Sequence, residues 1–384
     1  MPCMSSSPKP ISMSTIEAGA GMNRTAQKGV TLVELMVALV IGAIAALVIQ
    51  QVMAMFEGQK RTSSGGSDAQ VNGAVALFAL EREVRQAGYG LFGGSGSLCP
   101  LGINIYYNGT TVSNGGALLP LRIADGGAGP DAIEFLRSDA DFAAIPTSII
   151  KNMPNSSAEV TADSTGGLAQ NQMFLAAGKG GSKVCTLMQM SQDPQQTGNG
   201  WNLQHNSGQY LYNPPNANTA FATAPTYEIG DVVVNMGSFI HRRYQVLCER
   251  LTEVSPTLTA APYTCANTVP IVDQIVDMQV QYGVSPAGSM QITQWCNATA
   301  TSACGDWSNP GNNEVSRIRA VRIALVARSV QYEKEMVSPA NLTLWDAGDP
   351  GDPPPSLALT DDQRHYRYKV FTTIVPIRNV IWGS

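Results

Sequence analysis

The feature that most constrains this chain is an apolar run near its N-terminus. Residues 35–56, LMVALVIGAIAALVIQQVMAMF, contain no charged residue over 22 positions. As a helix the run would extend about 33 Å at ~1.5 Å per residue, which is enough to cross a bilayer. Arg24 and Lys28 precede it, so the positive-inside tendency places the N-terminus in the cytoplasm and the residues after Phe56 outside. The sequence therefore predicts one membrane-spanning helix that carries an external domain.

An ordinary secretory signal peptide is the alternative, because a small-residue site, Ala43-Ile44-Ala45, lies within the run. The run continues well past that site, and Glu34 places a carboxylate where the helix enters the membrane. Insertion of Asp at a helix centre costs roughly 2.5–3.5 kcal/mol, and less near an end. Glu34 therefore needs a compensating charge, unless it snorkels to the interface.

The segment around Glu34, KGVTLVELMVALVIG, resembles the prepilin signal of type IV pilins and type II secretion pseudopilins. It has a basic leader ending in Gly29, a hydrophobic first mature residue, Val30, and Glu34 as the fifth mature residue. The resemblance implies cleavage between Gly29 and Val30 by a prepilin peptidase, followed by N-methylation of Val30. The usual residue after the cleavage is Phe, and Val departs from it.

The same resemblance gives Glu34 a role in subunit assembly. Its carboxylate would pair with the α-amine of Val30 in a neighbouring subunit, which removes two unpaired charges from an apolar filament core. We also expect the true start to be Met22, which would leave an eight-residue leader, MNRTAQKG.

A second helical pattern follows the membrane run. Its glycines, at positions 58, 65, 66 and 73, each lower helix stability by about 1 kcal/mol relative to Ala, so we expect a bend or local unwinding there. Apolar residues then recur at helical spacing on one face: Leu77, Leu80, Val84, Ala87 and Leu91. The motif GxGxxG at residues 88–93 follows a helix instead of a strand, so its glycines are interpreted as a helix stop. The stretch RQAGYG resembles the PilW family of minor pilins.

The remainder of the chain predicts a β-rich domain. Six runs concentrate β-forming residues, at 131–138, 228–237, 242–254, 274–284, 319–329 and 366–379, and each is interpreted as one strand. The runs VDMQVQYGV, RIRAVRIALVARS and KVFTTIVPIRN also resemble PilW-type minor pilins. Residues 94–129 and 139–226, rich in Asn, Gly, Ser and Thr, are interpreted as long loops.

Cysteine usage points to an oxidising compartment. Of the seven cysteines, Cys3 would be lost with the leader, and six candidates for disulfides remain: Cys99, Cys185, Cys248, Cys265, Cys296 and Cys304. Proximity favours Cys248 with Cys265 and Cys296 with Cys304. No CxxC occurs and the three histidines are far apart, so no metal site is predicted. A calcium loop at 346–355, DAGDPGDPPP, is conceivable, but an acidic Pro-rich turn is favoured.

No sequence motif indicates a catalytic or a nucleic-acid-binding function. The chain lacks GxSxG, HExxH and a Walker loop, and its net charge of −5 with no basic run does not suit a phosphate backbone. We therefore predict no enzyme activity, no cofactor and no direct nucleic-acid binding.

The predicted fold class is α+β and pilin-like, with a long N-terminal helix packed on an antiparallel sheet domain. The expected parts are a leader (1–29), a transmembrane or filament-core helix (30–56), an amphipathic continuation (57–92) and a periplasmic β-rich domain (93–384). The family resemblance implies a minor pilin of a priming or tip complex, supporting twitching motility, adhesion or DNA uptake. Its partners would be other minor pilins, the major pilin, the prepilin peptidase and the inner-membrane assembly platform.

Two alternatives stay open. A type II secretion minor pseudopilin shares the same N-terminal chemistry. An unprocessed, membrane-anchored periplasmic binding or adhesion protein would keep its leader, and Glu34 would then be incidental. In the favoured interpretation the chain is a single-pass inner-membrane protein that later enters the pilus at the cell surface.

Overall fold

The computed structural model of the protein describes residues 29–93, 96–141, 145–156, 159–346 and 348–382. The predicted leader up to Lys28, with the start at Met22, therefore lies outside the described residues, as does Cys3. The chain divides into two compact units, Met1–Gln59 and Lys60–Ser384. Helix α1 (Leu32–Gln86) contributes to both, and the other elements of the described chain belong to the second unit.

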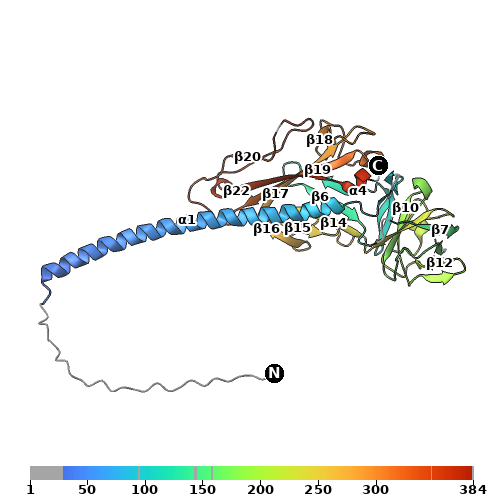
Figure 1. Ribbon diagram of the computed structural model, residues 1–384, viewed down its shortest axis with the longest axis horizontal. Helices are drawn as coiled ribbons and strands as arrows, with labels where there is room; N and C mark the ends of the chain where they lie inside the picture. The colour runs from blue at the N-terminus through green and yellow to red at the C-terminus, as the bar shows by residue number, and fades with distance from the viewer. Residues whose placement is uncertain (1–28, 94–95, 142–144, 157–158, 347, 383–384) are drawn as a thin grey trace, which may run out of the picture. The chain divides into compact units, whose positions relative to one another are not determined.

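Helix α1 is continuous from Leu32 to Gln86 (Figure 1). The expected local unwinding at its glycines does not occur. Gly73 has a packing role instead. A Cβ at this position would overlap the ring of Phe371, so glycine allows the helix to lie close to the sheet. Beyond the helix, Gly88 and Gly90 have φ values of 79° and 77°, the left-handed conformation in which glycines end helices, as predicted.

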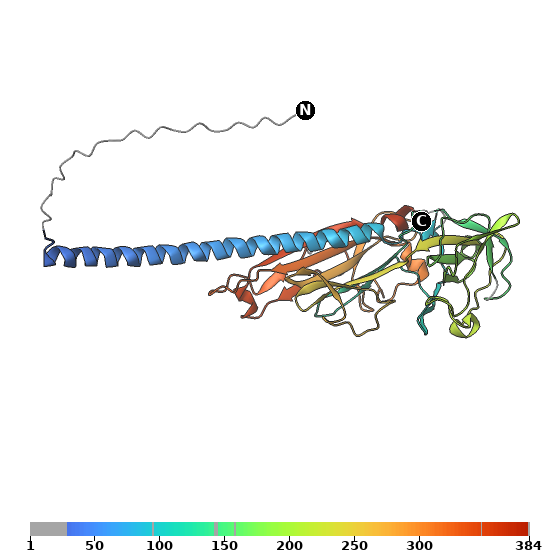
Figure 2. The same ribbon diagram turned by 90° about the horizontal axis from the view of Figure 1, so that it is seen from below.

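Two antiparallel sheets pack with the second part of α1 into one core (Figures 1 and 2). The four-stranded sheet has the order β18-β17-β19-β22, with β18 (Gln294–Cys296), β17 (Ile275–Val284), β19 (Ile318–Arg328) and β22 (Tyr368–Pro376). The five-stranded sheet has the order β16-β15-β14-β6-β5, with β16 (Val269–Asp273), β15 (Arg250–Val254), β14 (Ile240–Leu247), β6 (Ala132–Arg137) and β5 (Leu121–Ala124). From α1, the core receives Ala69, Ala76, Leu80, Val84 and Ala87.

Strand β19 is buried along almost its whole length, because both faces of its sheet are covered. Ile323 and Leu325 point into the core shared with α1. Ala324 and Val326 point to a second apolar cluster, formed with residues around the ribbon of β20 (Asn341–Thr343) and β21 (Ser356–Ala358). Burial on both faces explains why this strand does not alternate between polar and apolar residues and contains the uninterrupted apolar segment from Ile323 to Ala327.

A third, nine-stranded sheet lies beyond the C-terminal end of α1 (Figures 1 and 2). Its order is β11-β12-β8-β7-β13-β9-β10-β3-β4, with β11 (Gln195–Thr197), β12 (Gly200–Leu203), β8 (Val160–Ala162), β7 (Thr147–Lys151), β13 (Val232–Gly237), β9 (Met173–Ala177), β10 (Cys185–Gln189), β3 (Ile103–Tyr107) and β4 (Thr110–Gly116). Strands β10 and β3 are parallel. Both faces are buried in the middle of this sheet, since Leu175 of β9 points to one apolar cluster and Phe174 to another.

The interpretation of residues 94–129 and 139–226 as long loops is therefore wrong. These segments supply eight of the nine strands, and only β13 comes from a run predicted as a strand. The strands are short, and the burial of this sheet between two apolar clusters overrides their weak local preference.

Residues 242–254 also differ from the prediction. They form the hairpin β14–β15, with a two-residue turn at Cys248 and Glu249, instead of one strand. Both turn residues have positive φ, 51° and 58°, as a tight hairpin turn requires. The remaining short elements are β1 (Phe92–Gly93), β2 (Gly96–Ser97), η1 (Lys179–Gly181), α2 (Ala217–Ala220), α3 (Asn312–Val315), η2 (Gln363–His365) and α4 (Arg378–Trp382).

Candidate functional site

The first unit presents an exposed apolar helix surface. Between Leu32 and Phe56, the large apolar side chains of α1 are 43–76% exposed. Within the described residues, α1 is the one helix that is long and apolar enough to cross a membrane. Monomeric soluble proteins rarely expose contiguous apolar patches beyond a few hundred Å². This segment therefore suits a bilayer or a bundle of other apolar helices.

Glu34 lies in the first turn of α1, in a reciprocal arrangement with Thr31. The main-chain N–H of Glu34 donates to Thr31 Oγ1 at 3.2 Å, and the main-chain N–H of Thr31 donates to Glu34 Oε2 at 3.4 Å. This is a capping box, which satisfies N–H groups that have no partner within the helix. The spacing T-x-x-E is visible in the sequence and could have predicted Thr31 as the N-terminal cap of α1.

Gly29 and Val30 precede the helix in non-helical, exposed backbone. Val30 is 70% exposed, and a Cβ added at Gly29 would meet nothing within 4 Å. The predicted scissile bond, the predicted methylation site and Glu34 thus follow one another over six exposed residues at the start of the apolar helix.

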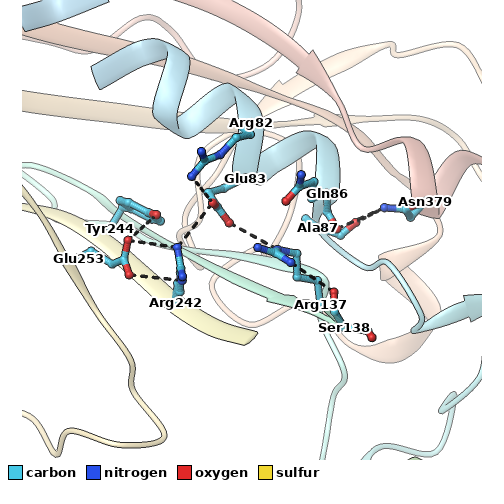
Figure 3. Close-up of polar contacts among 10 residues, drawn as sticks. All are labelled: Arg82, Glu83, Gln86, Ala87, Arg137, Ser138, Arg242, Tyr244, Glu253 and Asn379. Carbon is cyan, nitrogen blue, oxygen red and sulfur yellow. Dashed lines mark hydrogen bonds and ion pairs between the residues drawn. The ribbon is translucent and has the colours of Figure 1, made fainter. Parts of the chain in front are cut away.

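A buried carboxylate, Glu83, connects the second part of α1 to the five-stranded sheet (Figure 3). Its side chain is fully buried, and three guanidinium groups surround it. Arg82 Nη2 lies 3.2 Å from Oε1, Arg137 Nε lies 3.6 Å from Oε2, and Arg242 Nη1 lies 3.8 Å from Oε1. Since a buried charge is tolerated only when it is paired, this cluster specifies how α1 lies on the sheet.

The same cluster extends through Arg242 to a second carboxylate (Figure 3). Arg242 Nε lies 3.3 Å from Glu253 Oε1, and the hydroxyl of Tyr244 donates to Glu253 Oε2 at 2.7 Å. Burial, followed by the hydrogen bond to Glu253, raises the pKa of Tyr244, so this hydroxyl stays protonated and donates. The sequence shows Glu83 and its helical neighbours, but nothing in it brings residues 137, 242 and 253 together.

The C-terminal end of α1 is capped by a residue from the end of the chain. Asn379 of α4 donates to the carbonyl oxygen of Ala87 at 2.9 Å and to that of Gln86 at 3.4 Å (Figure 3). The last carbonyl groups of a helix lack partners within it, so this side chain supplies them. Helix α1 is thereby fixed along its side by Glu83 and at its end by Asn379.

Three disulfides join the six predicted cysteines, all within the second unit. They are Cys99–Cys185, Cys248–Cys265 and Cys296–Cys304, and the last two are the pairs favoured by proximity. Cys99 and Cys185 are fully buried, whereas Cys248 and Cys265 are exposed. The first pair fastens β10 to the segment before β3, and the second fastens the β14–β15 turn to the loop before β16.

Two carboxylates of the acidic segment 346–355 are used in internal contacts. Asp349 pairs with Arg322 at 2.6 Å, and Asp352 accepts from Ser302 Oγ at 2.6 Å and from the N–H of Ala303 at 2.7 Å. Arg322 itself lies between the rings of Trp295 and Trp345, with its guanidinium carbon 4.6 Å from each centroid. Over the described chain, no three side chains of His, Cys, Asp or Glu gather in a way that could hold a metal ion.

Two models of known protein families match this chain, one near its N-terminus and one over its C-terminal part. Residues 24–49 match the prokaryotic N-terminal methylation motif, a segment that contains Gly29, Val30 and Glu34. Residues 226–379 match the family model described as Type IV Pilus-assembly protein W, which covers β13 to β22. No curated protein and no solved structure matches the chain. The chain is therefore similar to the type IV pilus-assembly protein W over its C-terminal strands and to prepilin-type methylation signals over its N-terminal segment, as a minor pilin related to the type IV pilus is.

Proposed function

We propose that the protein is a minor pilin of a priming or tip complex that initiates assembly of the type IV pilus. Before assembly it would be anchored in the inner membrane by α1, with its second unit in the periplasm. Prepilin peptidase would cleave between Gly29 and Val30 and methylate Val30. Its partners would be other minor pilins, the major pilin and the assembly platform, with twitching motility, adhesion or DNA uptake as the outcomes.

One observation carries the proposal: a single carboxylate, Glu34, stands at the start of a helix whose next 22 residues are uncharged and exposed. In a membrane or in a bundle of apolar helices, an unpaired charge at this position costs free energy that a partner of opposite charge would recover. Cleavage before Val30 would create a positive α-amine four residues before Glu34 in every subunit. Pairing across subunits would neutralise both charges and set the axial position of one helix against the next.

The capping box offers a competing explanation for Glu34, and the two can be separated by substitution. Gln at position 34 keeps an acceptor for the N–H of Thr31 but has no charge, since capping boxes accept Glu or Gln. Val at position 31 removes the capping hydroxyl and leaves the charge of Glu34 in place. The first change removes only the proposed pairing, and the second weakens only the cap, by about 1 kcal/mol.

The test compares Glu34→Gln and Thr31→Val in cells that lack the native gene, with pili counted by electron microscopy and motility scored on the same cultures. We expect Glu34→Gln to reduce piliation at least tenfold at unchanged protein level, and Thr31→Val to retain it. Equal piliation by Glu34→Gln and wild type would remove subunit pairing as the role of Glu34. Loss of piliation by Thr31→Val alone would assign the role of the Thr31–Glu34 contact to helix capping.

A further inference from the structure

A cavity of about 260 Å³ lies within the second unit, between strands β3–β4 of the nine-stranded sheet and the five-stranded sheet. Its walls come from segments far apart in sequence, including Asn309 from the loop before α3. The apolar part of the wall is formed by Ile103, Ile105, Val112, Leu119 and Leu136. Ile103, Ile105 and Leu119 are at most 5% exposed, so this wall is part of the packed protein.

The polar part of the wall carries one cation and one carboxylate beside an imidazole ring. It contains Arg122, Glu134 and His241. Glu134 is already neutralised, because its Oε1 lies 2.6 Å from Arg243 Nη1. Arg122 is exposed, and across the described residues no carboxylate lies within ion-pair distance of its guanidinium.

His241 adds no charge to the cavity. Its Nδ1 is hydrogen-bonded to Thr257 Oγ1 at 2.8 Å, and burial lowers the pKa of His241 to about 4. The ring is therefore neutral near pH 7. Glu134 lies opposite Arg122 in the register of β5 and β6 but pairs with Arg243, so Arg122 is the charged group of the wall without an ion pair among the described residues.

We propose that this cavity binds a small organic carboxylate with an apolar body, whose carboxylate contacts Arg122 and whose body lies against the apolar wall. A concave apolar pocket with a few convergent polar groups is the usual form of a small-molecule site. The volume lies below the roughly 300–1,000 Å³ typical of drug-sized ligands, so the ligand is small. Arginine suits a carboxylate because its planar fork can donate two parallel hydrogen bonds.

The first test uses the wild-type, full-length protein in nanodiscs and three probes: 3-phenylpropanoate, the matched neutral alcohol 3-phenylpropanol, and acetate. Binding is measured by titration calorimetry, with empty nanodiscs as the blank. We expect 3-phenylpropanoate to bind saturably with a Kd of about 1 mM or below, and each of the other two probes at least tenfold more weakly. Absence of saturable binding overturns the proposal, as does equal affinity for the acid and the alcohol.

The second test locates the site. Arg122→Leu removes the cation, and Ala117→Trp fills the cavity from a half-exposed position in its wall. Arg378→Leu is the matched control, because Arg378 is also exposed but does not line the cavity. We expect at least tenfold weaker binding for the first two variants and unchanged binding for the control. Wild-type affinity in either cavity variant, with an unchanged melting temperature, places the ligand elsewhere and overturns the proposal.

Discussion

Gly73 of α1 lies against the ring of Phe371 in β22, with no space for a side chain between them. On an exposed helix, Gly→Ala would stabilise by about 1 kcal/mol. Here we expect Gly73→Ala to destabilise the protein by about 1–3 kcal/mol, because the new methyl group must displace the ring or the helix. Chemical denaturation of the full-length chain in detergent, followed by tryptophan fluorescence, measures this change.

Gly66 provides the control for that experiment. It lies in the same helix, and an added Cβ would meet nothing within 4 Å. Gly66→Ala should therefore leave the free energy of unfolding unchanged or raise it by up to about 1 kcal/mol. Equal effects of the two substitutions would mean that Gly73 is not needed for close packing.

Replacement of Glu83 tests how α1 is held on the domain. Glu83→Gln keeps the shape of the side chain but leaves Arg137 and Arg242 facing a neutral group in a buried site. Removal of one partner from a buried ion cluster costs about 3–5 kcal/mol. We expect a loss of this size in the free energy of unfolding.

An exposed ion pair is the comparison for Glu83. Arg250 and Asp273 are 2.6 Å apart with side chains 50% and 64% exposed, so Asp273→Asn should change stability by at most about 1 kcal/mol. A Glu83→Gln variant that is as stable as Asp273→Asn would show that the buried cluster contributes nothing to anchoring the helix.

The disulfides should differ in how readily they are reduced. Cys248 and Cys265 are exposed, whereas Cys99 and Cys185 are fully buried. Exposed disulfides are the more labile class, because a thiolate must reach the sulfur it attacks. With increasing dithiothreitol in the native state, followed by iodoacetamide labelling and mass spectrometry, Cys248 and Cys265 should be labelled first. Labelling of Cys99 and Cys185 at the same concentration would contradict the arrangement.

Asp131 predicts a pH dependence of stability. It is buried, its two carboxylate oxygens accept from the N–H groups of Gly126 and Val280 at 2.8 Å each, and burial raises its pKa to about 7. A folded pKa above the unfolded value of 3.8 means that the group stabilises the protein below pH ~4 and that this contribution is lost as the pH rises to about 7.

The variant Asp131→Asn cannot ionise, so its stability relative to wild type should improve by about 2–4 kcal/mol between pH 4 and pH 7. The difference between the two proteins is the quantity to follow, because His241 has the opposite pH dependence: burial lowers its pKa to about 4, and its contribution is lost as the pH falls. A constant difference between variant and wild type over this range would show that folding does not raise the pKa of Asp131.

The parts of the fold that the sequence predicts are those with strong local patterns. The apolar run of α1 and the doubly buried strand β19 are visible because each is a segment rich in apolar residues that differs clearly from its neighbours in sequence. The β14–β15 turn could not be predicted, since Cys248 and Glu249 adopt positive φ without Gly, Asn or Asp to mark the position. The nine-stranded sheet was hidden for a related reason, because its strands are short and their burial depends on contacts between distant segments.

Some residues of the candidate site could likewise be predicted from the sequence, and others could not. Gly29, Val30 and Glu34 could be found because their spacing along the chain carries the signal, and the T-x-x-E capping box at Thr31 could have been found likewise. Glu83 shows only as one acidic residue in a helix, and its significance depends on Arg137 and Arg242, which are brought to it by two strands of the five-stranded sheet. The cavity wall at Arg122 likewise exists only once the sheets are packed.

The central claim is that the chain is processed as a prepilin before it assembles. The measurement that tests it most directly is the intact N-terminal mass of the protein from cells with and without prepilin peptidase, alongside a Gly29→Ala variant. The account predicts a chain that begins at N-methylated Val30 in peptidase-positive cells, and an uncleaved leader in the other two samples. A leader retained in peptidase-positive cells, or a new N-terminus near Ala45, would contradict the account.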